Sequence, residues 1–417
     1  MSKFAACIHK LLCTGLLVLM SFAGLSACST QQSNATPDQN NNPIKIGASV
    51  SLTGDFSSDG KALQKGYTIW QDAVNKRGGL LGRPVKLDFV NDDSNKTQVT
   101  TNYQKLITVN HDDLVVGPFS TGLTIPAAAV ASRYNYALVE GAGTAPKVFQ
   151  QGFHNLFSVS LPAADYLKSF VSYILGLPAT QRPKKVAYVS SDDFFTHPQI
   201  DKAKEQLEKG GEQTALYTIY PAETTDYTPI AQKIISAQPD VVLLDTTAGS
   251  ECIAYIKAFH QQHFNPKVLI ATTGPDQGSQ FTDPIGGPQV AEGIFVPDGG
   301  WYPALTSYQN DQFIKDYVAK YGGKPDDISA DAAEAYSVGQ VLEQAVNKTH
   351  SVDNAKLIQE LHADTFNTIQ GPVRFADDGQ NTIAVPFLFQ WQDQKLIVVY
   401  PSNAAQKNPQ FPKKPWP

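Results

Sequence analysis

Two patterns of apolar and polar positions alternate along this chain: continuous apolar runs and amphipathic stretches. Continuous apolar runs rich in β-branched residues, such as 44–50 and 85–90, are typical of buried strands. Between these two runs, residues 61–77 are amphipathic and end at Gly78-Gly79, which predicts a helix with a glycine stop. The apolar positions at helical spacing in this stretch are Leu63, Tyr67, Trp70 and Val74. The pattern further predicts strands at 113–116 and 137–140 and helices at 97–109 and 124–134.

The same alternation restarts after a break at residues 160–162. It predicts helices at 166–175, 200–209, 229–237 and 251–262, and strands at 185–190, 215–220, 241–244 and 268–272. Later segments predict helices at 312–321 and 330–347, and a hairpin from 386–391 and 395–399. Strands that alternate with helices form parallel sheets with helices on both faces. The two series therefore predict an α/β fold of two doubly wound parallel-sheet lobes, with a ligand cleft beyond the carboxyl ends of the strands.

The N-terminus is typical of an export signal. Lys3 and Lys10 precede an apolar run at residues 11–23, which is shorter than a membrane-spanning helix needs to be. The run ends in Leu25-Ser26-Ala27-Cys28, which resembles a bacterial lipobox and predicts a signal peptide over 1–27 with lipidation at Cys28. A short buried helix that ends in cysteine is the alternative. Residues 28–42 hold the lipidated cysteine and a polar segment without large apolar side chains, which predicts a flexible tether.

Composition narrows the class of protein. The precursor carries 33 basic and 39 acidic residues, and loss of Lys3 and Lys10 with the signal leaves 31 against 39, a net charge of −8. Without a basic stripe, nucleic acid is not an expected partner. The folded part holds about 375 residues, which suits two domains rather than one. Of the four cysteines, only Cys252 remains beyond the lipobox, so no intramolecular disulfide is expected in the mature chain.

No arrangement of residues predicts catalysis. The segment 54–62 resembles a phosphate-binding loop, but its glycines are one residue too far apart and Ala62 stands where a hydroxyl is needed. No Gly-x-Ser-x-Gly elbow occurs, and no Ser/His/Asp set emerges. Cys252, His260 and His263 share a helical face, for which a polar surface helix is the simpler interpretation than a metal site. We therefore predict a protein that is not an enzyme and that carries no metal or cofactor.

Five stretches together resemble one family, the leucine/isoleucine/valine-binding periplasmic proteins of fold type I. The resemblance runs from Ile44 to Val399. Its segments are Ile44-Lys45-Ile46-Gly47 with Leu52-Thr53-Gly54, then Gly78-Gly79-Leu80-Leu81-Gly82-Arg83-Pro84-Val85, Val115-Val116-Gly117-Pro118 with Ser120-Thr121-Gly122, Ala291-Glu292-Gly293 and Gly371-Pro372-Val373-Arg374-Phe375. Each segment alone is a weak signal, but their order behind a lipobox is specific.

The resemblance implies where the ligand binds. The family's Ser-Ser-Gly turn matches Ser120, Thr121 and Gly122, whose hydroxyls and backbone N–H groups at a helix start would bind a carboxylate. Thr121 as a simple helix cap is the alternative. The family's next contacts, an Ala carbonyl for the ligand ammonium and a Thr hydroxyl for its carboxylate, match Ala142 and Thr144 around Gly143. Thr144 as an ordinary cap before Pro146 is the alternative there.

Other positions depart from the family pattern. Phe195 stands where the family often has a tyrosine, while Thr247 and Asp59 stand where relatives carry aromatic residues. The acidic residue that pairs with the ligand ammonium has no secure match. Asp276 is the nearest carboxylate, although Thr272 lies nearer the aligned position. Asp331 either faces the cleft or caps a helix in solvent.

The resemblance implies a monomeric, extracytoplasmic, lipid-anchored binding protein of an ABC importer, which closes on its ligand like a Venus flytrap and delivers it to a permease. Lobe 1 is expected from residues 43–160 and 298–371, and lobe 2 from 161–297 and 372–417. Crossings at 159–162, 293–297 and 371–373 are the expected hinges. Branched-chain amino acids are the family's default ligands, while amides, polyamines and aromatic acids remain open. The alternative functions are a ligand sensor for a membrane signalling partner and a secreted α/β hydrolase.

Overall fold

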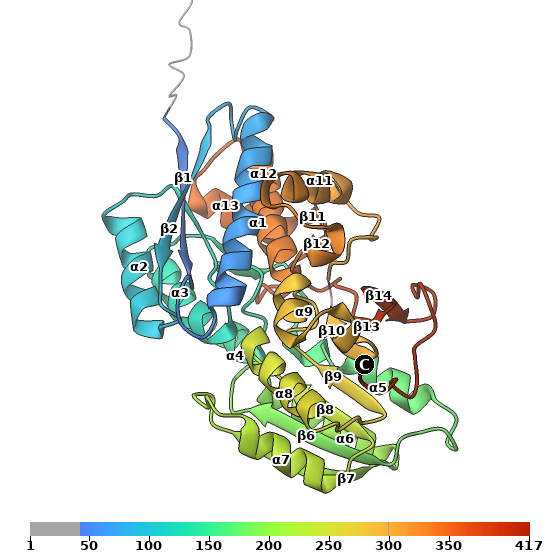
Figure 1. Ribbon diagram of the computed structural model, residues 1–417. Coiled ribbons are helices and arrows are strands. Elements are labelled where there is room, and N and C mark those ends of the chain that lie inside the picture. The colour runs from blue at the N-terminus through green and yellow to red at the C-terminus, as the bar shows by residue number, and fades with distance from the viewer. Residues whose placement is uncertain (1–41, 299) are drawn as a thin grey trace, which may run out of the picture. The chain divides into compact units, whose positions relative to one another are not determined.

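In the computed structural model, which describes residues 42–298 and 300–417, five parallel strands form the first of two large sheets (Figure 1). Their order is β2-β1-β3-β4-β5. Six of the seven residues of β1 are buried, as expected for a strand with helices on both faces. The strands are β1 (Ile44–Val50), β2 (Val85–Asn91), β3 (Leu114–Val116), β4 (Leu138–Glu140) and β5 (Leu156–Ser158).

Helices cover both faces of this sheet. Apolar residues of α1, α11, α12 and α13 form a core on one face, and those of α2, α3 and α4 form a core on the other. These helices are α1 (Ser57–Lys76), α2 (Lys96–Thr108), α3 (Thr121–Arg133), α4 (Pro146–Phe149), α11 (Asn310–Tyr321), α12 (Ala330–Thr349) and α13 (Asn354–Ala363). A small hairpin of β11 (Thr365–Thr368) and β12 (Gly371–Arg374) packs on the first core through Phe366 and Val373. We refer to this sheet with its helices and hairpin as lobe 1.

Helices α1 and α12 approach each other closely because each presents a glycine to the other. Gly66 of α1 lies against the backbone carbonyl of Ala332, and Gly339 of α12 lies against the indole ring of Trp70. A Cβ atom at either position would overlap its neighbour. Trp70 also donates its indole N–H to Glu343 of α12 over 3.2 Å, so this helix pair is fixed by both shape and a polar contact.

The second sheet has seven strands in the order β14-β13-β10-β9-β8-β6-β7. Strands β6 to β10 run parallel, and β13 and β14 join as an antiparallel hairpin at the edge. The strands are β6 (Lys185–Ser191), β7 (Gln213–Tyr220), β8 (Val241–Asp245), β9 (Val268–Ala271), β10 (Ile294–Asp298), β13 (Phe387–Gln392) and β14 (Lys395–Tyr400). We refer to this sheet with its helices as lobe 2.

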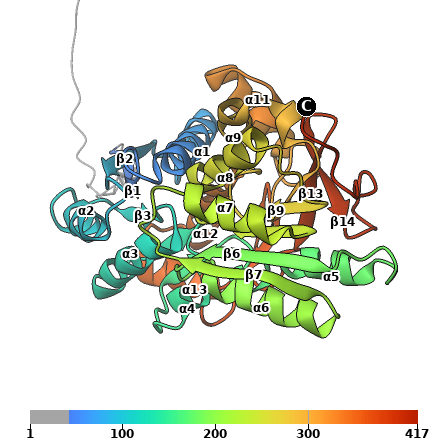
Figure 2. The same ribbon diagram turned by 60° about the horizontal axis from the view of Figure 1, so that its bottom comes forward.

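Lobe 2 is also covered on both faces. Helices α7, α8, α9 and α10 pack on one face, and α5 and α6 pack on the other, an arrangement that Figure 2 shows around β6 and β7. The helices are α5 (Lys168–Gly176), α6 (His197–Lys209), α7 (Thr228–Ala237), α8 (Gly249–Gln261), α9 (Ser279–Ile285) and α10 (Pro288–Ala291). The predicted α/β fold of two parallel-sheet lobes is confirmed.

Two of the predicted hinge segments are strands. Residues 294–298 form β10, which pairs with β9 on one side and β13 on the other, and residues 371–374 form β12. The positions predicted for these two hinges are therefore wrong, because a strand paired within a lobe moves with that lobe. After β12, Asn381 donates its side-chain N–H to the carbonyl of Val159 over 2.8 Å, which joins two segments that run between the lobes.

The predicted signal peptide, Cys28 and most of the tether lie outside the described residues. Within the described part of the chain, no helix is both long enough and apolar enough to span a bilayer.

Candidate functional site

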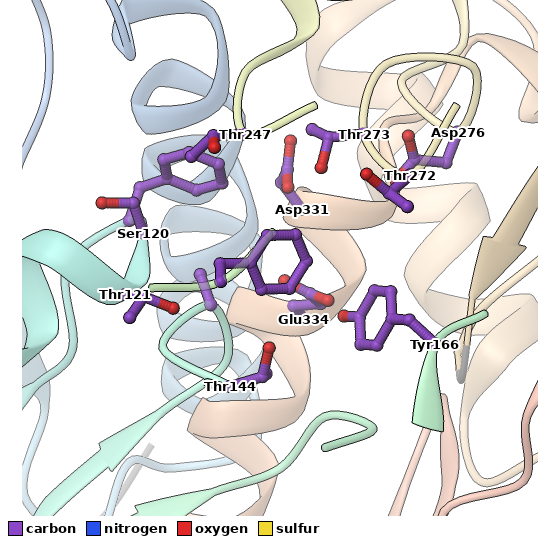
Figure 3. A pocket seen from close by; sticks show the side chains of 13 residues that line it. Ser120, Thr121, Thr144, Tyr166, Thr247, Thr272, Thr273, Asp276, Asp331 and Glu334 are labelled. Carbon is purple, nitrogen blue, oxygen red and sulfur yellow. The ribbon is translucent and has the colours of Figure 1, made fainter. Parts of the chain in front are cut away.

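A cavity of about 500 Å³ lies where the strand ends of the two lobes meet (Figure 3). The residues that line the cavity are Phe119, Ser120, Thr121, Ala142, Thr144, Tyr166, Phe195, Thr247, Thr272, Thr273, Asp276, Asp331 and Glu334. Seven of the ten predicted ligand residues are among them, and they come from loops that follow parallel strands, where ligands of such folds bind.

Three predicted ligand residues lie outside the lining. Gly122 lies in the first turn of α3 with its Cα facing the side chain of Lys96. Gly143 packs against Thr124 so closely that a Cβ atom would overlap it, so this glycine shapes the loop instead of contacting the cavity. Asp59 is fully buried in α1, behind the cavity wall, where it accepts a hydrogen bond from Gln277.

Three hydroxyl groups converge on one side of the cavity. Ser120 directly precedes α3, Thr121 is its first residue, and Thr144 follows β4 on a neighbouring loop. In Figure 3 the hydroxyls of Thr121 and Thr144 point toward the middle of the cavity and that of Ser120 points to one side, and all three oxygens are buried without a hydrogen-bond partner. A buried unpaired hydroxyl costs about 1–3 kcal/mol, so three together at a helix N-terminus form a prepared site for an anionic group. We name these residues the hydroxyl cradle.

The backbone at the cradle is also unusual. Ser120 has φ 70° and ψ 150°, a region that residues other than glycine rarely occupy. Such strain costs about 1–3 kcal/mol and is found at sites where the backbone must present itself to a ligand. The carbonyl of Ser120 still accepts from the N–H of Thr124 over 3.0 Å, so the helix begins normally behind the strained residue.

Glu140 holds the loop that carries Thr144 of the cradle. This carboxylate is fully buried and accepts the backbone N–H of Gly143, which fixes the turn that carries Thr144. Burial raises the pKa of Glu140 from 4.5 to about 7, although hydrogen bonds from the backbone lower it in part. The folded protein therefore binds this proton more tightly than the unfolded chain does.

Glu140→Gln is expected to stabilise the protein at pH 8 but not at pH 4. As the pH rises from about 4.5 through about 7, the folded state must give up a proton that it holds tightly, so this residue lowers the free energy of unfolding. The glutamine keeps an acceptor for Gly143 and removes the titration, which predicts a gain of about 2–3 kcal/mol at pH 8. Urea denaturation at both pH values measures it, and an equal gain at pH 4 would contradict this cause.

Carboxylates gather on the other side of the cavity. Asp276 follows β9 in lobe 2, and Asp331 and Glu334 lie in the first turns of α12 in lobe 1. Ser329 caps α12 and donates its hydroxyl to Asp331 over 3.0 Å. Figure 3 shows Asp331 and Asp276 with Thr272 and Thr273 across the cavity from the cradle, and Glu334 between the two groups. The cavity therefore favours a negative charge beside the hydroxyl cradle and a positive charge beside the carboxylates.

Gln277 of lobe 2 contacts two carboxylates of lobe 1. Its side-chain N–H groups are shared between Asp59 of α1 and Asp331 of α12, the latter over 3.5 Å. Burial is the main reason that the pKa of Asp59 rises to about 7 and that of Asp276 to about 6. Ser58 of lobe 1 also donates to Gln280 of lobe 2 over 2.9 Å, so the lobes are in direct polar contact beside the cavity.

Aromatic rings form the apolar part of the wall. Phe119 lies just before the cradle and packs against Phe56, with ring centroids 5.5 Å apart. Tyr166 and Phe195 meet edge to face, with centroids 5.3 Å apart. Phe195 was expected at the site from the family resemblance, whereas Phe119 and Tyr166 were not.

Sequence reasoning missed four lining residues, Phe119, Tyr166, Thr273 and Glu334, and it left open whether Asp331 faces the cleft and whether Thr272 takes the place of the acidic residue. Sequence patterns could have placed some of these residues at the cavity. Thr272 and Thr273 directly follow β9, and residues after a parallel strand are expected at the ligand edge. Asp331 and Glu334 are three residues apart near a helix start, which places both carboxylates on one face of α12.

A second cavity of about 840 Å³ adjoins the first, and the two share Thr247. Its ionisable lining residues include Asp55, Asp193 and Glu251. No group of His, Cys, Asp or Glu in the described part of the chain is arranged to hold a metal ion, and Cys252 is buried with its pKa raised by burial.

Comparison with known proteins agrees with this geometry. Residues 43–395 match the family described as periplasmic binding protein. Leu/Ile/Val-binding protein homolog 8 of Brucella suis biovar 1 (strain 1330) is 24% identical over 408 residues, covering 95% of this chain and 99% of that protein. Homolog 7 of the same strain is 25% identical over 373 residues, covering 87% and 92%.

Solved structures share the fold. An ABC transporter solute-binding protein from R. palustris in complex with benzoate has a TM-score of 0.75 at 19% identity, covering 86% of this chain and 96% of that chain. A branched-chain amino acid transporter substrate-binding protein from Streptococcus pneumoniae in complex with isoleucine has a TM-score of 0.74 at 20% identity, covering 86% and 100%.

Proposed function

Because this chain belongs to the periplasmic binding protein family, we propose that it captures an α-amino acid between its two lobes and delivers it to an ABC permease. The observation that carries the proposal is the hydroxyl cradle: three lining residues, at the start of α3 and on the loop after β4, have buried hydroxyl oxygens without hydrogen-bond partners. A carboxylate would satisfy all three and interact favourably with the helix dipole. The ligand's ammonium would lie toward the carboxylates opposite, and no bond would be made or broken.

The binding step would be closure of one lobe on the other. Ser120, Thr121 and Thr144 would hold the ligand on lobe 1, while Phe195, Thr247 and Asp276 would complete the site from lobe 2. The segments between the lobes near residues 159–162 and 382–386, and the crossing that follows β10, would serve as hinges. Asn381, which donates a hydrogen bond to the carbonyl of Val159, would couple the motions of the two segments that hold these residues. This division of the chain into lobes remains part of the proposal.

Isothermal titration with a panel of free amino acids, their amides and benzoate tests this function. We expect at least one amino acid to bind with a one-to-one ratio, and its amide, which lacks the carboxylate, to bind at least about tenfold more weakly. Small-angle scattering should show that the liganded protein is more compact than the unliganded protein. Binding of benzoate alone, or equal affinity for acid and amide, would contradict the proposal.

We also propose that the chain is attached to the outer face of the cell membrane through lipid on Cys28. The family's extracytoplasmic location and the lipobox support this, and several acyl chains on one cysteine anchor stably. Cys28→Ser is expected to move the protein from the membrane fraction to the soluble fraction of the expressing cells. If the variant stayed with the membrane, the anchor would lie elsewhere.

A further inference from the structure

The carboxylates in the cavity lining are not matched by any basic residue of the described lining. Three carboxylates line it, those of Asp276, Asp331 and Glu334, and none of its thirteen described lining residues is Lys, Arg or His. Asp331 and Glu334 are 6% and 8% exposed. Hydrogen bonds from hydroxyl or amide groups stabilise such charges but do not cancel them, so a buried cluster of carboxylates is stable only when it gains protons or a cation.

The acidity is concentrated at the end of the cavity that lies farthest from the cradle. Asp276 and Asp331 line this end, and Asp59 lies just behind it, where it shares Gln277 with Asp331. One oxygen of Asp59 is buried without a partner, and the Asp276 charge further raises its pKa. We name Asp276 and Asp331, with Asp59 behind them, the acidic end.

Glu334 lies nearer the cradle than the acidic end does. Its Cβ is about 3.0 Å from the place where a side chain on Gly141 would begin, so it stands beside the loop that carries Ala142 and Thr144. In Figure 3 its carboxylate lies between Thr144 and Asp331. One carboxylate is therefore placed for an α-ammonium next to the cradle, and those of Asp276 and Asp331 line the other side of the cavity.

A neutral amino acid would bring no positive charge to the acidic end, whereas a cationic side chain would interact favourably with it. Building on the function proposed above, we propose that the ligand is a basic amino acid whose side chain carries an ammonium or guanidinium group. Its α-carboxylate lies in the hydroxyl cradle, its α-ammonium pairs with Glu334, and its distal cation pairs with Asp276 and Asp331. The three unpaired cradle hydroxyls show that the cavity is built for a ligand, and the acidic end specifies the charge of that ligand's far side.

The adjoining cavity fits this assignment. Asp55, Asp193 and Glu251 line it, so the route past Thr247 is acidic too, although Lys96 acts electrostatically on Asp193. Carboxylates along an opening raise the local concentration of cations and repel anions, so they favour the approach of a basic ligand over that of an aromatic acid.

Titration of the wild-type protein with arginine, lysine, leucine and benzoate tests the inference without any variant. We expect arginine or lysine to bind at least about 100-fold more tightly than leucine, because leucine brings no partner for the acidic end. If leucine binds as tightly as arginine and lysine, or more tightly, this inference is wrong and the proposed amino-acid function stands. If no amino acid binds, both fail.

Asp331→Asn provides the second test, with Asp311→Asn on the exposed start of α11 as a control of equal charge change. Asp331→Asn should weaken binding of the basic amino acid at least about tenfold and change leucine affinity by less than about threefold. The control should change neither. Thermal melts of the unliganded proteins establish that the variants fold. Equal losses for leucine and for the basic ligand would show that Asp331 supports only the fold of the site, which would overturn the assignment of the distal cation.

Discussion

Replacing Thr121 and Thr144 together by valine is expected to weaken amino-acid binding by about two to four orders of magnitude. Each hydroxyl is buried and unpaired, and each would donate to a charged carboxylate, an interaction worth about 1.5–3 kcal/mol. Valine has the shape of threonine, so the cavity keeps its volume and loses only the two donors. Isothermal titration with the tightest amino acid of the panel measures the loss.

The same double variant should be at least as stable as the wild type without ligand. Removing an unpaired buried hydroxyl removes a cost of desolvation instead of a favourable contact. Affinity and stability therefore move in opposite directions, which distinguishes a ligand-binding role from a helix cap, because loss of a cap would lower stability by about 1 kcal/mol. Thr228→Val, at the exposed first position of α7, is the matched control and should leave affinity unchanged. Affinity within about threefold of wild type in the double variant would refute the cradle.

Gly66→Ala is expected to destabilise the protein by about 1–3 kcal/mol, although alanine is the better helix former. The added Cβ would overlap the carbonyl oxygen of Ala332, which belongs to the backbone of α12 and cannot rotate away. The two helices would have to separate, and the apolar contacts of lobe 1 would loosen with them. Urea denaturation of the unliganded protein measures the change.

Gly176→Ala is the control for this prediction. Gly176 is the exposed last residue of α5, and a Cβ there meets no atom within 4 Å. The same substitution should therefore be neutral or stabilise by up to about 1 kcal/mol, as helix propensity alone predicts. Equal effects at the two positions would mean that the close approach of α1 and α12 does not limit stability.

Much of the fold could be predicted because its signal is local. The apolar runs of β1 and β8 and the helical spacing of α1 identify these elements without any knowledge of their neighbours. Strand β10 could not be recognised in this way. This strand, Ile294–Asp298, follows Gly293 and has a proline at its fourth position, a pattern that suggested a crossing between lobes. In the structure, however, Ile294, Phe295 and Val296 are fully buried within a sheet.

The site residues, too, include some that local sequence could predict and some that it could not. The cradle could be predicted because Ser120, Thr121 and Thr144 follow strands within lobe 1 and match a family motif. Of the carboxylates of α12, Asp331 could be given only as one of two alternatives and Glu334 was not predicted, because helical spacing alone does not tell which end of α12 reaches a cavity formed about 200 residues earlier in the chain. Asp59 was expected at the cavity from the family resemblance, where relatives carry an aromatic residue, but it is not part of the lining and accepts a hydrogen bond from Gln277 of lobe 2.

The packing of α12 on α1 has a consequence for the order in which this chain can fold. Lobe 1 buries its largest core only when residues 330–349 meet residues 57–76, and lobe 2 adds its edge strands from residues 387–400. Most of the sequence must therefore be available before either lobe is complete, and bringing such distant segments together slows folding. We therefore expect both lobes to become compact only after the last strands of the chain have been synthesised.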